Sequence, residues 1–187
     1  MTRILGASAV MVAFGIAVVG MVLAVVGARL RRPDLVRGAY AATYVNLGLL
    51  ESHQGNYVDA ATSFGRALAL RPNDAEAENN LGTMLVLLGK IEEGIAHYRR
   101  ALDLRPDYAL ARRNLGLAYA NVGDSATGAR EVQEALRISP TESQWHYEVA
   151  VMLLRLNRTA DGILHLREAL RLKPDLQAAR DLLAGLR

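Results

Sequence analysis

The sequence predicts an all-α protein in which one N-terminal membrane-spanning helix precedes four helical hairpins of equal length. Two observations predict this class: residues 4–28 form an uninterrupted apolar segment, and the chain after residue 40 repeats itself every 34 residues. Composition agrees, since 51% of the 187 residues are hydrophobic but only 5% are aromatic. The apolar content comes from Ala, Leu and Val, which favours helices packed through small side chains over a β-sandwich.

The apolar segment is long enough to span a bilayer, since crossing the hydrocarbon core takes about 20 apolar residues. A cleaved signal peptide is the alternative, with Val26 and Ala28 before the cut. Three features favour a retained anchor, which would span residues 1–28. The segment is long, only Arg3 precedes it, and arginines follow it directly.

Residues 29–40 form a basic juxtamembrane linker. Its arginines place the following domain in the cytoplasm, because positive flanks stay on that side of a membrane. The periplasmic side is the alternative, and the Ala- and Arg-rich composition indicates a bacterial inner membrane. Beyond the linker, acids and bases nearly balance, so the net charge of +3 does not indicate a nucleic-acid partner. The basic residues of the linker are Arg29, Arg31, Arg32 and Arg37.

Small residues recur along one face of the apolar segment at helical spacing. Such a face lets another membrane helix approach closely, so it predicts helix–helix packing in the bilayer. An Ala- and Gly-rich segment also produces such a face by chance. The residues are Ala9, Ala13, Ala17, Gly20 and Ala24.

The repeat divides residues 41–176 into four units, 41–74, 75–108, 109–142 and 143–176. Small residues at positions 8, 20 and 27 of each unit predict close helix packing, and large residues at position 24 fill the space beside them. Position 15 predicts a left-handed residue that ends the first helix. Position 32 is Pro72, Pro106, Pro140 or Pro174, which ends the second helix. The residues that follow these prolines are expected N-caps: Asn73, Asp107, Thr141 and Asp175.

These constraints resemble the tetratricopeptide repeat (TPR) family over residues 41–176 without insertion. The resemblance implies a right-handed α-solenoid whose concave surface is lined by the first helix of each repeat. Residues 177–187 are expected to form a capping helix over the last hairpin. The tryptophan typical of position 4 is missing, which leaves the local packing of each first helix open. Tyr44, Glu78, Arg112 and His146 stand at that position.

The resemblance implies a partner-binding groove at the lining positions of the first helices. A ladder of asparagines at position 6 would bond the backbone of an extended peptide, although it is also explained as a feature that stabilises the superhelix. Aliphatic residues lie between them, and Arg113 is the single residue expected to serve an anion. The predicted groove residues are Asn46, Asn80, Asn114, Val45, Leu49, Val86, Arg113, Leu117, Val151 and Leu154.

No catalytic, metal or cofactor site is predicted. The chain has no cysteine, and no two histidines have the i, i+4 spacing of a zinc motif. The paired lysine and asparagine of carboxylate-clamping relatives are also missing. We therefore expect a non-enzymatic, membrane-anchored scaffold that binds a protein or peptide partner, as an assembly factor or accessory subunit of a membrane complex. No nucleic acid or small-molecule substrate is expected. The alternative is a permanent structural subunit held through its membrane helix.

Overall fold

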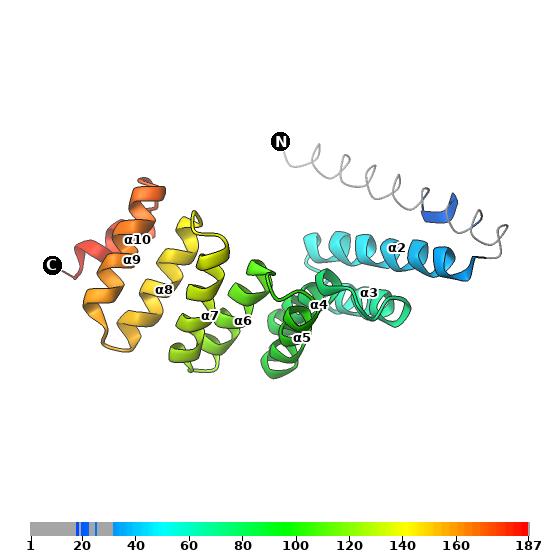
Figure 1. Cartoon of the computed structure of the whole chain (residues 1–187), viewed down its shortest axis with the longest axis horizontal. Coiled ribbons are helices and arrows are strands. Elements are labelled where there is room, and N and C mark those ends of the chain that lie inside the picture. The colour runs from blue at the N-terminus through cyan, green and yellow to red at the C-terminus, as the bar shows by residue number, and fades with distance from the viewer. Residues whose placement is uncertain (1–17, 19, 23–24, 26–31, 187) are drawn as a thin grey trace. The chain divides into compact units, whose positions relative to one another are not determined.

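The computed structural model describes residues 18, 20–22, 25 and 32–186, and the elements between residues 33 and 184 are all α-helices (Figure 1). The chain divides into two compact units, Met1–Leu104 and Arg105–Arg187. Unit 1 contains α2 (Pro33–His53), α3 (Tyr57–Leu70), α4 (Ala75–Leu87) and α5 (Ile91–Leu104). Unit 2 contains α6 (Ala109–Asn121), α7 (Ser125–Ile138), α8 (Ser143–Arg155), α9 (Thr159–Leu172) and α10 (Gln177–Ala184).

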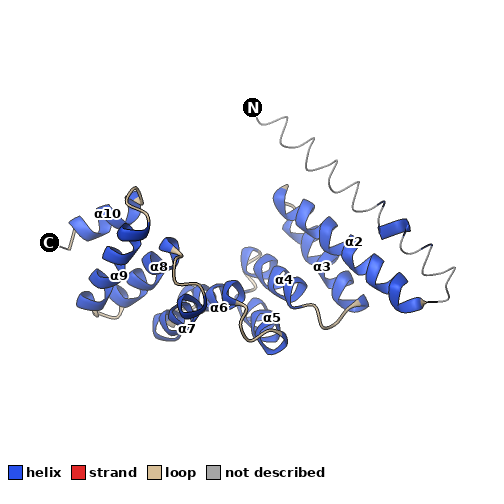
Figure 2. Ribbon diagram, turned by 45° about the horizontal axis from the view of Figure 1, so that its top comes forward, coloured by secondary structure: helices blue, strands red, loops and turns tan. Residues whose placement is uncertain are grey.

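Each predicted repeat is a pair of antiparallel helices joined by a short loop (Figure 2). The hairpins are α2–α3 and α4–α5 in unit 1, and α6–α7 and α8–α9 in unit 2. Within each unit the hairpins stack, because α3 packs against α4 and α7 against α8. The prediction of an all-α fold built from stacked helical hairpins is confirmed.

The loops inside the hairpins turn through a left-handed residue at repeat position 15. The backbone angle φ is +81° at Gly55, +80° at Gly89 and +92° at Gly123, and it is +58° at Asn157. Glycine has no Cβ to clash in this conformation, and asparagine tolerates it better than most residues. The predicted role of position 15 is therefore confirmed.

The expected N-caps were placed one residue too early. In the loop that follows each of the four repeats, the proline and the residue after it form a turn. The next helix starts after one further residue. Asp74 caps α4, and its Oδ1 accepts hydrogen bonds from the backbone N–H groups of Glu76 and Ala77. The expected caps Asn73, Asp107, Thr141 and Asp175 lie in the turns instead, where Asp74, Tyr108, Glu142 and Leu176 are the residues before the helices.

The core of each hairpin is made by a large residue at position 24 packed on a small one at position 8. A Cβ on Gly48 would lie 2.9 Å from Phe64 Cε1, and one on Gly116 would lie 2.6 Å from Val132 Cγ2. Phe64 is fully buried in a cluster with Leu81, Met84 and Leu85 of α4, which joins the first hairpin to the second. At the end of unit 2, a cluster around Leu166 includes Ala179, Leu182, Leu183 and Leu186 of the terminal segment.

The predicted membrane segment lies almost wholly outside the described residues. Within the described part of the chain, no helix combines the length and apolar character needed to cross a bilayer. Helix α2 begins at Pro33, so the predicted linker is helical from that residue onward and belongs to the first hairpin.

Gly20 is the one predicted membrane-packing residue that the structure describes. It is buried against α2, where a Cβ at this position would lie 2.6 Å from Thr43 Oγ1 and 3.4 Å from the backbone oxygen of Ala39. The lack of a side chain at Gly20 thus permits a close approach to α2 of the same chain. Ala9, Ala13, Ala17 and Ala24 lie outside the described residues.

Candidate functional site

In unit 1 the predicted groove residues divide into a packed set and an accessible set. Val45 packs against the Phe64 cluster, and Val86 contacts Gly94 of its own hairpin, where a Cβ would lie 2.6 Å from Val86 Cγ2. Both are half-buried and serve the fold. Leu49 is 39% exposed, and the carboxamides of Asn46 and Asn80 are half-buried beside the core.

The carboxamide of Asn80 is hydrogen-bonded to the carboxamide of its neighbour Asn79. Its Oδ1 accepts a hydrogen bond from Asn79 Nδ2 at 3.3 Å, and Asn79 is itself buried. The Nδ2 donors of Asn80 and the second lone pair of its Oδ1 are not used by this bond.

In unit 2 Arg113, the residue predicted to serve an anion, pairs with a carboxylate of the chain itself. Its Nε donates to Glu148 Oε2 at 2.9 Å, its Nη2 donates to Glu148 Oε1, and its Nη1 donates to Asn114 Oδ1 at 3.2 Å. Such a fork-to-fork pair satisfies the guanidinium. The contact joins position 5 of α6 to position 6 of α8, so these positions of consecutive first helices face one another.

The aliphatic groove residues of unit 2 are half-buried. Leu117 packs against the core cluster around Leu153, and Leu154 lies over Gly162, where a Cβ would lie 3.0 Å from Leu154 Cγ. Val151 is half-buried. Only part of the surface of each of these side chains is therefore exposed to solvent.

Two exposed leucines at lining positions were missed. Leu87, at position 13 of α4, is 53% exposed, and Leu110, at position 2 of α6, is 42% exposed. The family resemblance implies that positions 2 and 13 of a repeat also line the concave surface, so the repeat register alone could have added these leucines.

Position 4, where the family tryptophan is missing, carries a polar pair across the hairpin. Its partner is the residue at position 23 of the same repeat, which lies 19 residues later in the second helix. The sequence spacing did not reveal this pairing. The distances between the closest polar atoms are 2.5 Å for Glu78–His97, 3.0 Å for Arg112–Glu131 and 3.0 Å for His146–His165.

Donors at position 4 also satisfy the carbonyl of the proline in the loop before the first helix. Arg112 Nη2 donates to the Pro106 oxygen at 3.2 Å, and Arg180 Nε donates to the Pro174 oxygen at 2.7 Å. A polar residue at position 4 thus fastens the start of each of these helices to the preceding loop.

His146 and His165 form a neutral chain of hydrogen bonds in the last hairpin. His146 Nε2 lies 3.2 Å from the Pro140 oxygen, which can only accept, so Nε2 carries the hydrogen and Nδ1 accepts. His165 Nδ1 therefore donates to His146 Nδ1 at 3.0 Å, and its Nε2 accepts from Gln133 Nε2 at 3.5 Å. A proton added to either ring disturbs this order.

Acidification should destabilise the fold through His165. Burial and then the neighbouring His146 lower the pKa of His165, while Asp161 and Glu168 oppose this shift. Because the unfolded chain binds the proton more readily, stability present above a pH of about 6.5 is lost as the pH falls toward the lower folded-state pKa.

Thermal melts between about pH 7.5 and pH 5 test this expectation. The variant His165→Gln lacks the titrating ring, so its melting temperature should fall less with acidification than that of the wild type. Parallel pH profiles for the two proteins would contradict it.

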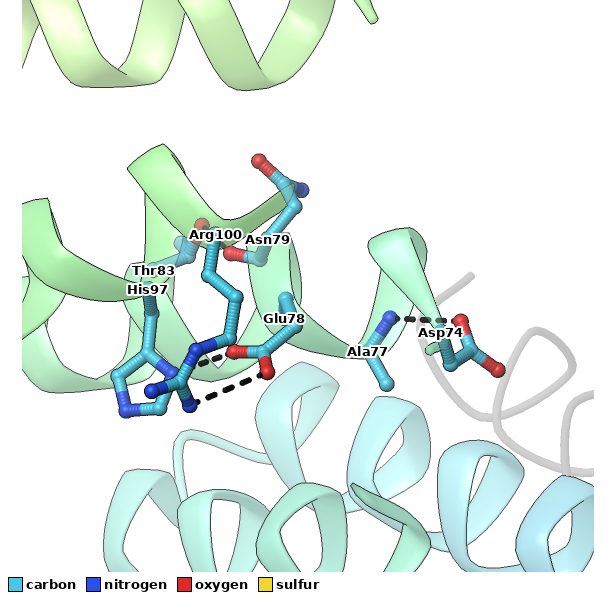
Figure 3. Close-up of polar contacts among 7 residues, drawn as sticks. All are labelled: Asp74, Ala77, Glu78, Asn79, Thr83, His97 and Arg100. Atoms are coloured by element: carbon cyan, nitrogen blue, oxygen red, sulfur yellow. Dashed lines mark hydrogen bonds and ion pairs between the residues drawn. The ribbon is translucent and has the colours of Figure 1, made fainter. Parts of the chain in front are cut away.

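The Glu78 pair in unit 1 extends to a third residue and to a cavity. Glu78 is 2% exposed, and its Oε1 lies 3.5 Å from Arg100 Nη1 while its Oε2 faces His97 (Figure 3). A cavity of about 500 Å³ opens beside these three residues. Within the described part of the chain, no group of three or more His, Cys, Asp or Glu residues is arranged to hold a metal ion.

Comparisons with known proteins identify the repeats. A TPR repeat model matches residues 82–123, and tetratricopeptide repeat models match residues 41–74 and 113–177. No curated protein sequence matches the chain.

Solved structures show the same fold at low sequence identity. MamA from Desulfovibrio magneticus RS-1 is 20% identical with a TM-score of 0.69, over 86% of this chain and 97% of that one. YrrB, described as a TPR protein with an unusual peptide-binding site, is 20% identical with a TM-score of 0.69, over 85% of this chain and 87% of that one. The first TPR of Spaghetti, bound to an HSP90 peptide, is 18% identical with a TM-score of 0.58, over 60% of this chain and 89% of that one. The family matches and the hairpin geometry together show that this chain carries tetratricopeptide repeats.

Proposed function

We propose that the protein is a membrane-anchored interaction scaffold that holds a partner polypeptide on the first-helix faces of its repeats. It would act as an assembly factor or an accessory subunit of a membrane complex. One observation carries this proposal: the Arg113–Glu148 contact places positions 5 and 6 of consecutive first helices side by side. Side chains at the lining positions of α6 and α8 therefore lie on one surface within unit 2.

The accessible residues of these faces suit a polypeptide. Leu49, Leu87 and Leu110 expose aliphatic surface, and the half-buried Asn46 and Asn80 supply carboxamides. Carboxamides bond backbone groups, while exposed leucines take apolar side chains. The structures of YrrB and of the first TPR of Spaghetti are described with a peptide-binding site and a bound peptide, which supports the same use here.

No catalytic role is proposed. TPR folds typically serve as interaction scaffolds, and the polar groups that lie together here pair with one another across hairpins.

The membrane part of the proposal rests on the apolar residues 4–28 and the arginines that follow them. An anchor would hold the repeats near a membrane complex and raise their effective concentration there. The arrangement we favour has the repeats in the cytoplasm of a bacterium. Membrane fractionation of the full chain and of a chain without residues 1–28 tests the anchor, since the truncated chain should leave the membrane fraction.

Photo-cross-linking tests the binding face. A benzoylphenylalanine placed at Leu49 or Leu87 should cross-link to a partner in membranes, because both positions lie on the proposed face. The matched control is Glu92, which is exposed at the start of the second helix α5 and should give no adduct. Adducts at Glu92 alone would place the partner elsewhere.

The partner captured in this way also tests the asparagines. The double variant Asn80→Ala, Asn114→Ala should reduce its recovery by about tenfold, the loss expected when about 1.4 kcal/mol of binding free energy is removed. Unchanged recovery would remove the carboxamides from the proposal.

A second candidate is a permanent structural subunit that contacts its complex through the membrane helix. The small residues at Ala9, Ala13, Ala17 and Ala24 support this alternative, whereas Gly20 of the same predicted face packs against α2. Deleting residues 1–28 separates the two functions, because binding of the partner in detergent extract should survive under the first and disappear under the second.

A further inference from the structure

The cavity beside Glu78 is built from three elements of unit 1. Helix α3 and the loop after it supply four of the lining residues, and α4 and α5 supply the other four. Leucines and a proline are apolar members of this lining, and Glu78, His97 and Arg100 are polar ones. The lining residues are Gly65, Leu68, Pro72, Asn73, Glu78, Leu81, His97 and Arg100.

Gly65 leaves this space open for no evident structural reason. It lies inside α3, where glycine is a poor helix former, and a Cβ built on it would meet nothing within 4 Å. The other repeats hold the long side chains of Arg99, Gln133 and Arg167 at this position, so only the first repeat has no side chain there.

The polar residues of this lining retain hydrogen-bond donors for a ligand that accepts hydrogen bonds. Both oxygens of Glu78 are engaged, one by His97 and one by Arg100. A carboxylate only accepts, so His97 Nδ1 is the donor in that pair. The Arg100 side chain is 65% exposed, and a guanidinium carries five N–H donors.

We propose that this cavity binds a carboxylate attached to a short aliphatic group. Arg100 donates to the carboxylate, and the aliphatic part packs against Leu68 and Leu81. Glu78 and Arg100 are the charged residues that line the cavity from α4 and α5, whereas α3 and its loop contribute only uncharged residues to the lining.

This inference goes beyond the proposed function and does not depend on it. The carboxylate has two possible sources, the C-terminus of a partner polypeptide and a free small acid. The titration below measures the site directly, so its outcome is independent of whether a partner is captured on the first-helix faces.

The experiment is an NMR titration of the isotope-labelled full chain in detergent micelles with three probes. N-acetylleucine represents a polypeptide C-terminus, 4-methylpentanoate represents a free acid, and N-acetylleucinamide lacks the carboxylate. We expect saturable shifts at Gly65 and His97 with the acids and none with the amide. About tenfold tighter binding of N-acetylleucine would identify the polypeptide source, and equal or tighter binding of 4-methylpentanoate would identify the free acid.

Three variants sharpen the result. Gly65→Gln fills the cavity with the side chain found in the third repeat, so it should weaken binding by at least about tenfold without lowering the melting temperature. Arg100→Gln should weaken binding to a similar extent. Arg137→Gln is the matched control, since Arg137 is an exposed arginine of unit 2, and it should bind as the wild type does.

Equal shifts with the acid and the amide, or undiminished binding by the folded Gly65→Gln protein, would overturn the proposal.

Discussion

Replacing His97 with leucine should lower the free energy of unfolding by about 3 kcal/mol, because the change leaves a buried carboxylate without its close partner. Glu78 is 2% exposed, and after this substitution only Arg100, at 3.5 Å, remains near it. Leaving a buried hydrogen-bonding group without its donor typically costs about 1–3 kcal/mol, and the charge of Glu78 places the cost at the upper end of that range. Urea unfolding followed by circular dichroism measures the difference.

A second substitution separates charge burial from lost packing. In the double variant Glu78→Met, His97→Leu no buried charge remains, so most of the stability should return. Lys90→Ala is the control for an exposed pair, since Lys90 and Glu93 lie 3.4 Å apart in solvent and contribute about 0–1 kcal/mol. A His97→Leu protein as stable as Lys90→Ala would show that Glu78 does not need its partner.

The hairpins were predictable because their constraints recur at fixed spacing. Gly89 and Asn157 stand at the same repeat position, and both adopt the left-handed conformation that the pattern required. The caps failed because sequence shows which residue types can cap but not where a turn ends. Asn73 and Asp74 are both good caps, and the turn at Pro72 leaves only Asp74 before the helix.

The polar contacts of the candidate sites were not predictable from spacing. Arg113 looked available because its partner Glu148 lies 35 residues later, on the next first helix. The test of the histidines for i, i+4 spacing describes one helix, whereas His146 and His165 meet across two helices. Gly65 resembles the packing glycines in the sequence, and only the structure shows that its Cβ direction is empty.

Replacing Phe64 with alanine should destabilise unit 1 by about 3–5 kcal/mol, the usual cost of removing a fully buried aromatic side chain. Phe64 packs on Gly48 within its hairpin and on Leu81, Met84 and Leu85 of the next one, so the cavity would open at the contact between hairpins. Leu164→Ala is the control, since Leu164 is an exposed helical residue and should cost little. Denaturant melts of both variants measure the contrast.

The residues at positions 8 and 24 differ in size between repeats in a compensating way. Gly48 faces Phe64 in the first hairpin. In the fourth hairpin the larger Ala150 and the smaller Leu166 lie in one core cluster. Gly48→Ala alone should therefore cost about 1–3 kcal/mol, because its Cβ would lie 2.9 Å from a rigid ring. In a Phe64→Leu background the same change should cost less, since the hairpin then has the pair found in the fourth repeat. A double-mutant cycle should show a coupling energy of at least about 0.5 kcal/mol, and additive effects would mean that positions 8 and 24 vary independently.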